Sequence, residues 1–147
     1  MSDRFAMCCS GPVHSAATSG VGLLAADISH RVHIYDWLFG HGGAAADAVI
    51  SNQLQRFTAV PTGTQVTPIA LDLAAGTAAQ NATQSSTGGT YSGCLITIPT
   101  NQRASHRWVA APDGELVIPA TASNGIAYTA MEASLSTNMH ATFHFMG

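Results

Sequence analysis

Residues 101–126, which read NQRASHRWVAAPDGELVIPATASNGI, contain the clearest strand and turn pattern in this sequence. Residues 107–109 are an aromatic and β-branched run, and residues 116–118 are a second apolar run. The residues between them are typical of a tight turn, because proline presets φ at about −65° and glycine tolerates a positive φ. The pattern predicts a β-hairpin that reverses at residues 112–114. Its structural residues are Arg107, Trp108, Pro112, Asp113, Gly114 and Glu115.

Arg107 and Glu115 lie on opposite arms of this predicted hairpin, where an ion pair could join them across the two strands. Such a pair contributes about 0.2–1 kcal/mol, so we expect it to fix the register rather than to stabilise the fold. A second turn at Asn124 and Gly125 leads into a predicted strand at residues 126–128. Nothing in the hairpin has the pattern of an active site.

The chain has the length of one domain and an unusually low content of charged residues. Its 147 residues can bury about two-thirds of the surface of the unfolded chain. Only 9% of them are charged, against about 25% in an average protein, while 46% are hydrophobic. We therefore expect other subunits to cover part of the exterior. All five basic residues are arginine and the formal charge is −3, which argues against a nucleic acid partner.

The cysteines and the N-terminus indicate a protein of a reducing compartment. Cys8, Cys9 and Cys94 are odd in number and two of them are adjacent, so they form no paired disulfide framework. Residues 1–9 contain an aspartate and an arginine and are not expected to be a secretion signal. Apolar stretches such as residues 21–26 are much shorter than the ~20 residues of a membrane span, so no membrane partner is expected.

The first part of the chain is predicted to be separate from the rest. Residues 1–22 are expected to form an extended N-terminal arm, and residues 23–147 a single β-sandwich domain. Ser10-Gly11-Pro12 interrupts regular structure, and residues 15–20 are small and polar without a strand or helix period. A segment of this kind becomes ordered only on a partner.

Several stretches of the domain have a strand pattern. Residues 31–37 carry bulky side chains on both faces, as in a strand that is covered on both sides or lies at a subunit contact. Residues 139–145 alternate between apolar and polar side chains, which predicts a strand with one buried face. Residues 64–73 predict an edge strand or a bulge around Pro68, and residues 94–98 a short apolar strand.

Other stretches are less specific. Residues 40–43 are expected to be a turn, and residues 76–93 a long polar loop. Residues 44–54 fit either a short helix or a loop before a strand at residues 52–58. Together the segments give eight or nine short strands, which predicts an all-β fold: an antiparallel β-sandwich, jelly-roll-like, with the arm attached.

Histidines are the most abundant candidates for chemistry. A zinc site needs three or four ligands at about 2.0–2.3 Å, usually from close positions on a turn or helix. His30 and His33 fall on opposite faces of an extended segment, and His140 and His144 are about 13 Å apart along a strand. We expect the histidines to be neutral polar side chains on half-buried faces. The seven are His14, His30, His33, His41, His106, His140 and His144.

Motifs of catalysis do not stand out. The sequence has no Gly-x-Ser-x-Gly elbow, no glycine-rich phosphate loop and no pair of neighbouring carboxylates within an apolar run. The adjacent cysteines are expected to be inert. The sequence therefore predicts no enzyme activity and no bound cofactor.

Residues 101–126 also resemble a pattern in small virion structural proteins of tailed bacteriophages, of the head decoration (cement) type. Residues 101–104, 107–112, 114–122 and 124–126 carry the resemblance, with a looser similarity at residues 142–145. The resemblance implies a β-sandwich that binds the capsid surface as a homotrimer and stabilises contacts between subunits of the major capsid protein. It implies a place on the virion, with assembly in the host cytoplasm, and it brings no catalytic residues.

Two other functions stay open at this stage. The same fold could serve as a trimeric receptor- or sugar-binding module of a tail fibre, with Trp37, Tyr91 and Trp108 exposed for stacking on sugars. It could also be a metal-dependent jelly-roll enzyme of the cupin type, with His140 or His144 among ligands from distant segments.

Overall fold

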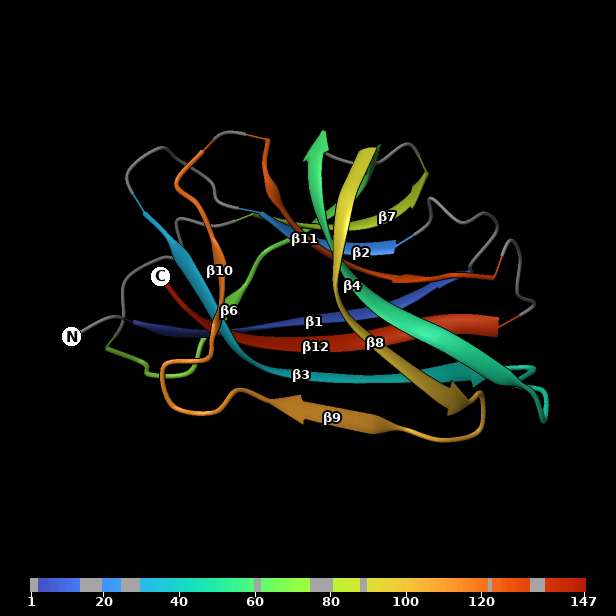
Figure 1. The fold of residues 1–147 in the computed structure, drawn as a ribbon. Coiled ribbons are helices and arrows are strands. Elements are labelled where there is room, and N and C mark those ends of the chain that lie inside the picture. Colours follow the sequence, from blue (N-terminus) through green and yellow to red (C-terminus); the bar gives the residue numbers. More distant parts are fainter. Residues whose placement is uncertain are drawn as a thin grey trace.

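The computed structural model describes residues 3–13, 20–24, 30–59, 62–74, 81–87, 90–121, 123–132 and 137–147. These residues form twelve β-strands and no helix, arranged in two antiparallel sheets that pack against each other (Figure 1). The all-β antiparallel β-sandwich expected from the sequence is confirmed. The jelly-roll-like course of the chain stays a prediction.

The first sheet, named sheet A, contains most of the core aromatic side chains. Its strands follow the order β10-β3-β12-β1-β6, and β9 also pairs with β3. Both described ends of the chain lie on the same side of the molecule in Figure 1. The strands of sheet A are β1 (Arg4–Val13), β3 (Val32–Gly43), β6 (Ile69–Ala70), β9 (His106–Val109), β10 (Leu116–Ile118) and β12 (Thr137–Met146).

The second sheet, named sheet B, covers the inner face of sheet A. Its order is β5-β7-β2-β11-β4-β8, and β4 and β8 are long strands that curve across the front of Figure 1. The strands of sheet B are β2 (Gly20–Leu24), β4 (Val49–Ala59), β5 (Thr62–Val66), β7 (Asn81–Thr87), β8 (Thr90–Asn101) and β11 (Gly125–Ala130).

The core lies between the sheets and follows the alternation of the strands. In residues 139–145 of β12 the apolar side chains are buried and the polar ones between them are half-buried, as the sequence predicts. Trp37 stands at the centre, with ring centroids 4.2 Å from Phe39 and 5.4 Å from Tyr128. Aromatic contacts at these distances add stability beyond the area they bury. The buried side chains of β12 are Thr137, Met139, Ala141, Phe143 and Phe145.

The structure corrects the predicted N-terminal arm. Residues 4–13 form β1, which pairs with β12 on one side and with β6 on the other. Phe5, Met7 and Cys9 alternate into the core and are at most 4% exposed. The expected boundary at residue 22 falls inside β2, a strand of sheet B. The arm is therefore wrong for residues 4–13, while residues 14–19 lie outside the described part of the chain.

The predicted hairpin at residues 107–118 is also wrong. Both arms pair with the same edge of β3: Trp108 lies opposite Trp37 in β9, and Val117 lies opposite His33 in β10. Both pairings are antiparallel, so β9 and β10 run in the same direction, one after the other. The chain leaves β3 after Ala110, whose N–H donates to the carbonyl of Tyr35 at 2.9 Å, and returns to β3 at Leu116.

The turn between these two strands forms where expected but with different dihedral angles. Gly114 donates its backbone N–H to the carbonyl of Ala111 at 2.8 Å, which closes a β-turn. Asp113 takes the positive φ, 61°, that the sequence analysis gave to Gly114. Aspartate tolerates this region better than most residues because its short side chain can bond locally. A Cβ on Gly114 would lie 3.1 Å from the Ala111 carbonyl oxygen, so this position favours glycine for space instead.

The predictions for the strands and loops of residues 40–93 are only partly confirmed. Of the two readings of residues 44–54, the strand holds, since β4 begins at Val49. Residues 40–43 continue β3 instead of turning, and β7 lies within the expected loop at residues 76–93. Threonine-rich segments of that kind suit a ladder even where their polarity suggests a loop. Residues 64–73 were predicted to be an edge strand or a bulge around Pro68, and they instead contribute to two edge strands, β5 of sheet B before Pro68 and β6 of sheet A after it.

Pro99 lies at the free edge of sheet B. It faces Ser51 of β4, whose carbonyl accepts from Met131 on the β11 side. The backbone groups of Pro99 therefore point away from β4, toward the open edge. Proline costs no ladder bond there and removes one donor that another strand could pair with.

Candidate functional site

The outer face of sheet A is built from rows of side chains that run across its strands. One row joins Ile69, Ala6, His144, Asp36 and Val109, which face each other in register over β6, β1, β12, β3 and β9. Its two apolar ends are exposed, Ile69 at 70% and Val109 at 55%. Exposed apolar side chains at both ends of such a row favour contact of this face with another molecule.

A β-bulge places Asp36 on this face. Ile34 lies opposite Phe145 and Asp36 lies opposite His144, so β3 has one extra residue, Tyr35, at this point. The extra residue reverses the alternation, which leaves Ile34 and Trp37 in the core and turns the side chain of Asp36 outward.

Asp36 is nevertheless only 1% exposed, because two side chains cover it. Arg107 donates Nε to Oδ1 at 2.9 Å and Nη2 to Oδ2 at 2.7 Å, a two-pronged bond. Nδ1 of His144 lies 2.8 Å from Oδ2, and the ring of His144 stacks on Tyr35. The cluster Asp36, Arg107 and His144 ties the edge strand β9 and the inner strand β12 to β3.

The electrostatics of the cluster favour an ionised carboxylate. Burial alone would raise the pKa of Asp36, but the hydrogen bonds and positive charge of Arg107 and His144 hold it below its ordinary value. Arg107 has its own pKa raised by the hydrogen bond to Asp36. The carboxylate and the guanidinium neutralise each other, so the cluster adds little net charge to the face.

Beside this cluster the face is hollowed into an open groove of about 520 Å³. The floor follows the next row of the sheet, in which Cys8, Thr142, Leu38 and Arg107 are in register. Gly40 continues the hollow because it places no side chain beside His140. Among the residues that the structure describes, the lining holds arginine, histidine, hydroxyl and thiol groups and no aspartate or glutamate. The groove thus offers hydrogen-bond donors above an apolar floor.

A second polar cluster lies inside the sandwich and joins the two sheets. The Tyr128 hydroxyl donates to Oδ1 of Asn52 at 2.7 Å and lies 3.3 Å from Nε2 of His41. Asn52 donates in turn to Oγ1 of Thr100 at 2.9 Å. Burial raises the pKa of Tyr128 above its ordinary value, and the nearby Glu132 raises it further. These groups are paired with one another inside the core, which is how such a cluster is normally satisfied.

Replacing Tyr128 by phenylalanine is expected to lower the free energy of unfolding by about 1–3 kcal/mol, because Oδ1 of Asn52 loses its donor while it stays buried. Urea denaturation followed by fluorescence measures the change. Tyr35 on the outer face is the matched control, and Tyr35→Phe should change the stability by less than about 0.5 kcal/mol. Equal losses in the two variants would contradict the role of the Tyr128 hydroxyl.

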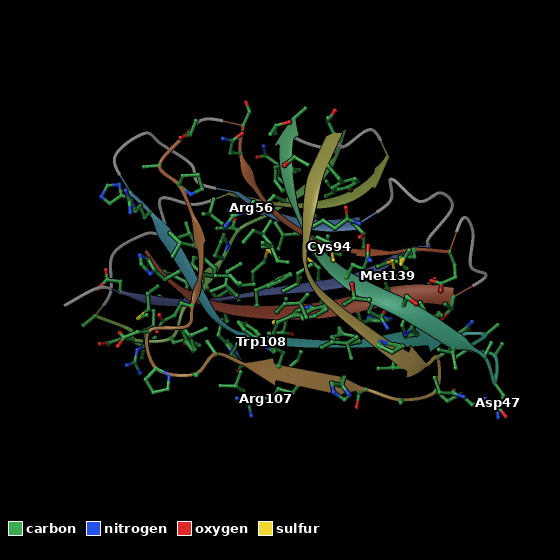
Figure 2. The ribbon with its side chains drawn as sticks, in the orientation of Figure 1. Asp47, Arg56, Cys94, Arg107, Trp108 and Met139 are labelled. Carbon is green, nitrogen blue, oxygen red and sulfur yellow. The ribbon has the colours of Figure 1, made fainter. Side chains whose placement is uncertain are left out.

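The predicted hairpin residues do not form one site. Arg107 pairs with Asp36 and not with Glu115, so the expected ion pair across the hairpin is wrong. Figure 2 shows Trp108 and Arg107 on opposite sides of β9, with Trp108 toward the sandwich. The segment that connects β9 to β10 contains the other four residues, which are Pro112, Asp113, Gly114 and Glu115.

The aromatic and histidine candidates are placed as follows. Trp37 is fully buried, Trp108 packs against the core, and burial raises the pKa of Tyr91 to about 12. Within the described ranges, no three His, Cys, Asp or Glu side chains gather in a way that could hold a metal ion. His14 lies outside those ranges.

The pairing of Asp36 with His144 and the groove beside it were not predicted from the sequence. The one signal for Asp36 was its position as a carboxylate within the apolar strand of residues 31–37. Within the described part of the chain, no helix is long and apolar enough to cross a membrane. No family model matches this chain, and searches of curated proteins and of solved structures find no match either.

Proposed function

We propose that this chain is a structural protein of a tailed bacteriophage particle, of the head decoration type. It binds the head surface as a homotrimer, as the resemblance at residues 101–126 implies, and adds contacts between subunits of the major capsid protein. It stabilises the shell by burying surface in protein contacts and does not act as a catalyst. Its place is the outside of the capsid, which it reaches after assembly in the host cytoplasm.

The observation that carries the proposal is the outer face of sheet A. Its six strands present a broad surface on which Arg107 neutralises the buried Asp36. The two end residues of the row described above, Ile69 and Val109, are exposed. Leu71 and Leu73 extend the apolar edge next to β6, at 52% and 102% exposure. Exposed apolar side chains at both edges of the sheet, on a chain with 9% charged residues, are typical of a protein that binds neighbouring proteins.

Uncharged polar side chains on sheet B also support the proposed role as a decoration protein. Gln55 donates to Gln53 and to Thr129, and Gln53 donates to Thr97, so amides and hydroxyls cross the face from β11 to β8. These side chains satisfy each other and carry no charge. Contacts that join proteins stably bury about 1,200–2,000 Å² each, and repeated copies on one shell add up through avidity.

The sugar-binding alternative loses support at particular residues. Stacking on a sugar needs an exposed aromatic face, and Trp37 has none because it is fully buried. No specific contact of the described residues favours the metal-dependent enzyme over the structural protein.

The test is electron cryomicroscopy of particles produced from the genome that encodes this chain, with the gene intact or deleted. We expect density on the outside of the head that disappears on deletion and returns when the purified protein is added. Deletion particles should also release their DNA at a lower temperature. Heads without any difference between the two preparations, or density confined to the tail, would overturn the proposal.

A further inference from the structure

The groove on sheet A has the chemistry of a site for an acidic, partly apolar segment. Leu38 and Thr142 form its floor, and Arg107, His106 and His140 stand around it. The side chain of Arg107 is 60% exposed although it is bonded to Asp36, so one side of its guanidinium still faces the groove and the solvent. Planar guanidinium groups prefer carboxylates, and Asp36 occupies Nε and Nη2 of Arg107 while Nη1 has no bond to it.

A segment of matching chemistry protrudes from the opposite edge of the same sheet. Residues 71–73 read Leu-Asp-Leu and follow β6 directly. Both leucines are exposed, Leu71 at 52% and Leu73 completely, so Leu73 buries no surface within this molecule. Asp72 accepts a hydrogen bond from the backbone of Ala74 at 2.9 Å, which holds this turn in a fixed shape.

One molecule does not bring this segment to its own groove. Leu71 donates its backbone N–H to the carbonyl of Arg4 at 2.8 Å, which fixes the segment at the start of β1. Cys8, a groove residue of β1, is four positions further along the strand, about 13 Å away. The segment also lies beyond the edge of the sheet, whereas the groove extends from β1 across β12 to β9.

We propose that the 71–73 segment of one copy of this chain binds in the sheet A groove of a second copy. Leu71 and Leu73 lie on the apolar floor, and the carboxylate of Asp72 accepts hydrogen bonds from Arg107. The inference names the contact behind the self-association that the proposed function includes, and it rests on that part of the proposal. Apolar residues on both sides of an acid match an apolar floor with basic walls, which is the complementarity that selects partners.

The contact joins two different surfaces, since an edge of one copy binds a face of the next. Contacts of this kind close into a ring or continue as an open chain, depending on the rotation that they impose. Each copy keeps one groove and one segment for its neighbours, so every copy in a closed ring is equivalent. A symmetric dimer through this contact alone would need two such contacts at once.

The test is a charge swap followed by sedimentation equilibrium of the full chain. Asp72→Arg places a cation against Arg107, and Thr142→Glu places an acid on the groove floor against Asp72. Each change alone should weaken self-association by roughly a hundredfold or more, because like charges meet at the interface. The double variant carries both substitutions and so places opposite charges across the contact again, and self-association should return to within about tenfold of the original.

Matched controls carry the same charges elsewhere. Asp47→Arg changes an exposed acid at the tip of the β3–β4 connection (Figure 2), and Thr64→Glu adds an acid to the edge strand β5. Both should leave self-association unchanged, and circular dichroism should show that all variants are folded. Unchanged assembly in the two single variants, or no rescue in the double variant, would overturn the inference.

These outcomes separate the inference from the proposed function. If the swap variants fail to alter assembly but the protein still decorates heads, only the 71–73 contact is wrong. If the swap behaves as expected but heads show no decoration, the contact holds and the proposed function is wrong.

Discussion

Deleting residues 1–13 is expected to prevent folding, because it removes β1 from the interior of sheet A. The deletion takes Phe5, Met7 and Cys9 out of the core and leaves β12 unpaired on one side. Phe5 and Met7 alone are worth roughly 5–10 kcal/mol, judged from truncations of core residues. A domain of this kind has only about 5–15 kcal/mol of net stability. Circular dichroism and thermal unfolding of the truncated chain measure the loss.

Point variants in β1 distinguish a core strand from a flexible arm. Met7→Ala, in the core, should lower the free energy of unfolding by about 2–5 kcal/mol. Cys8→Ser, one position later on the outer face, should change it by less than about 0.5 kcal/mol. An arm would make both substitutions neutral and would leave the truncated chain folded. The thiols give the same contrast, since Cys8 is exposed while burial raises the pKa of Cys9 to about 12.

The deletion also affects how particle binding is interpreted. An arm that reaches onto a capsid would be tested by removing it and measuring occupancy of the particle. Because residues 4–13 are part of the sandwich, lost binding after that deletion would report lost folding. Surface changes such as those at Asp72 and Thr142 leave the core intact and are the better test of a contact.

The sequence predicted the strands whose pattern is local. The alternation in β12 was visible because a strand with one buried face alternates between apolar and polar residues. The edge position of the strands around Pro68 was visible because proline lacks a backbone donor, although the change of sheet between β5 and β6 was not. β1 was missed although Phe5, Met7 and Cys9 alternate, since Ala6 and Cys8 between them are also apolar and Gly11-Pro12 suggested a break.

What the sequence did not reveal was the choice of partners. The arms at residues 107–109 and 116–118 have strand patterns, but nothing local indicates that each pairs with β3 and not with the other. Asp36 and Arg107 are 71 positions apart, and they meet only because the bulge at Tyr35 turns Asp36 outward. The groove has the same origin, since it depends on the order β9-β3-β12-β1 across the sheet. Both features are properties of the register, which a single sequence leaves open.

Asp36→Ala is expected to lower the free energy of unfolding by about 3 kcal/mol, because a buried carboxylate with three charged hydrogen bonds is lost. Asp36→Asn should be nearly as destabilising although it keeps the shape, since its NH₂ group faces donors. The released Arg107 becomes hydrated, and β9 loses its side-chain tie to β3. Hydrogen exchange should then show faster opening of residues 106–109, while the inner strand β11 keeps its protection.

The same carboxylate sets a pH dependence of stability whose sign follows from its pKa. Hydrogen bonds hold the pKa of Asp36 lower in the folded than in the unfolded state, so the unfolded chain binds more protons in acid. The stabilisation is therefore complete above the unfolded value of about 3.9 and is lost as the pH falls through the folded value. Urea denaturation at a series of pH values should give a wild-type stability that declines below about pH 4, and a weaker decline in Asp36→Asn. Parallel curves for the two proteins would mean that Asp36 is not the group whose protonation loosens the sheet, and that the carboxylate contributes through packing alone.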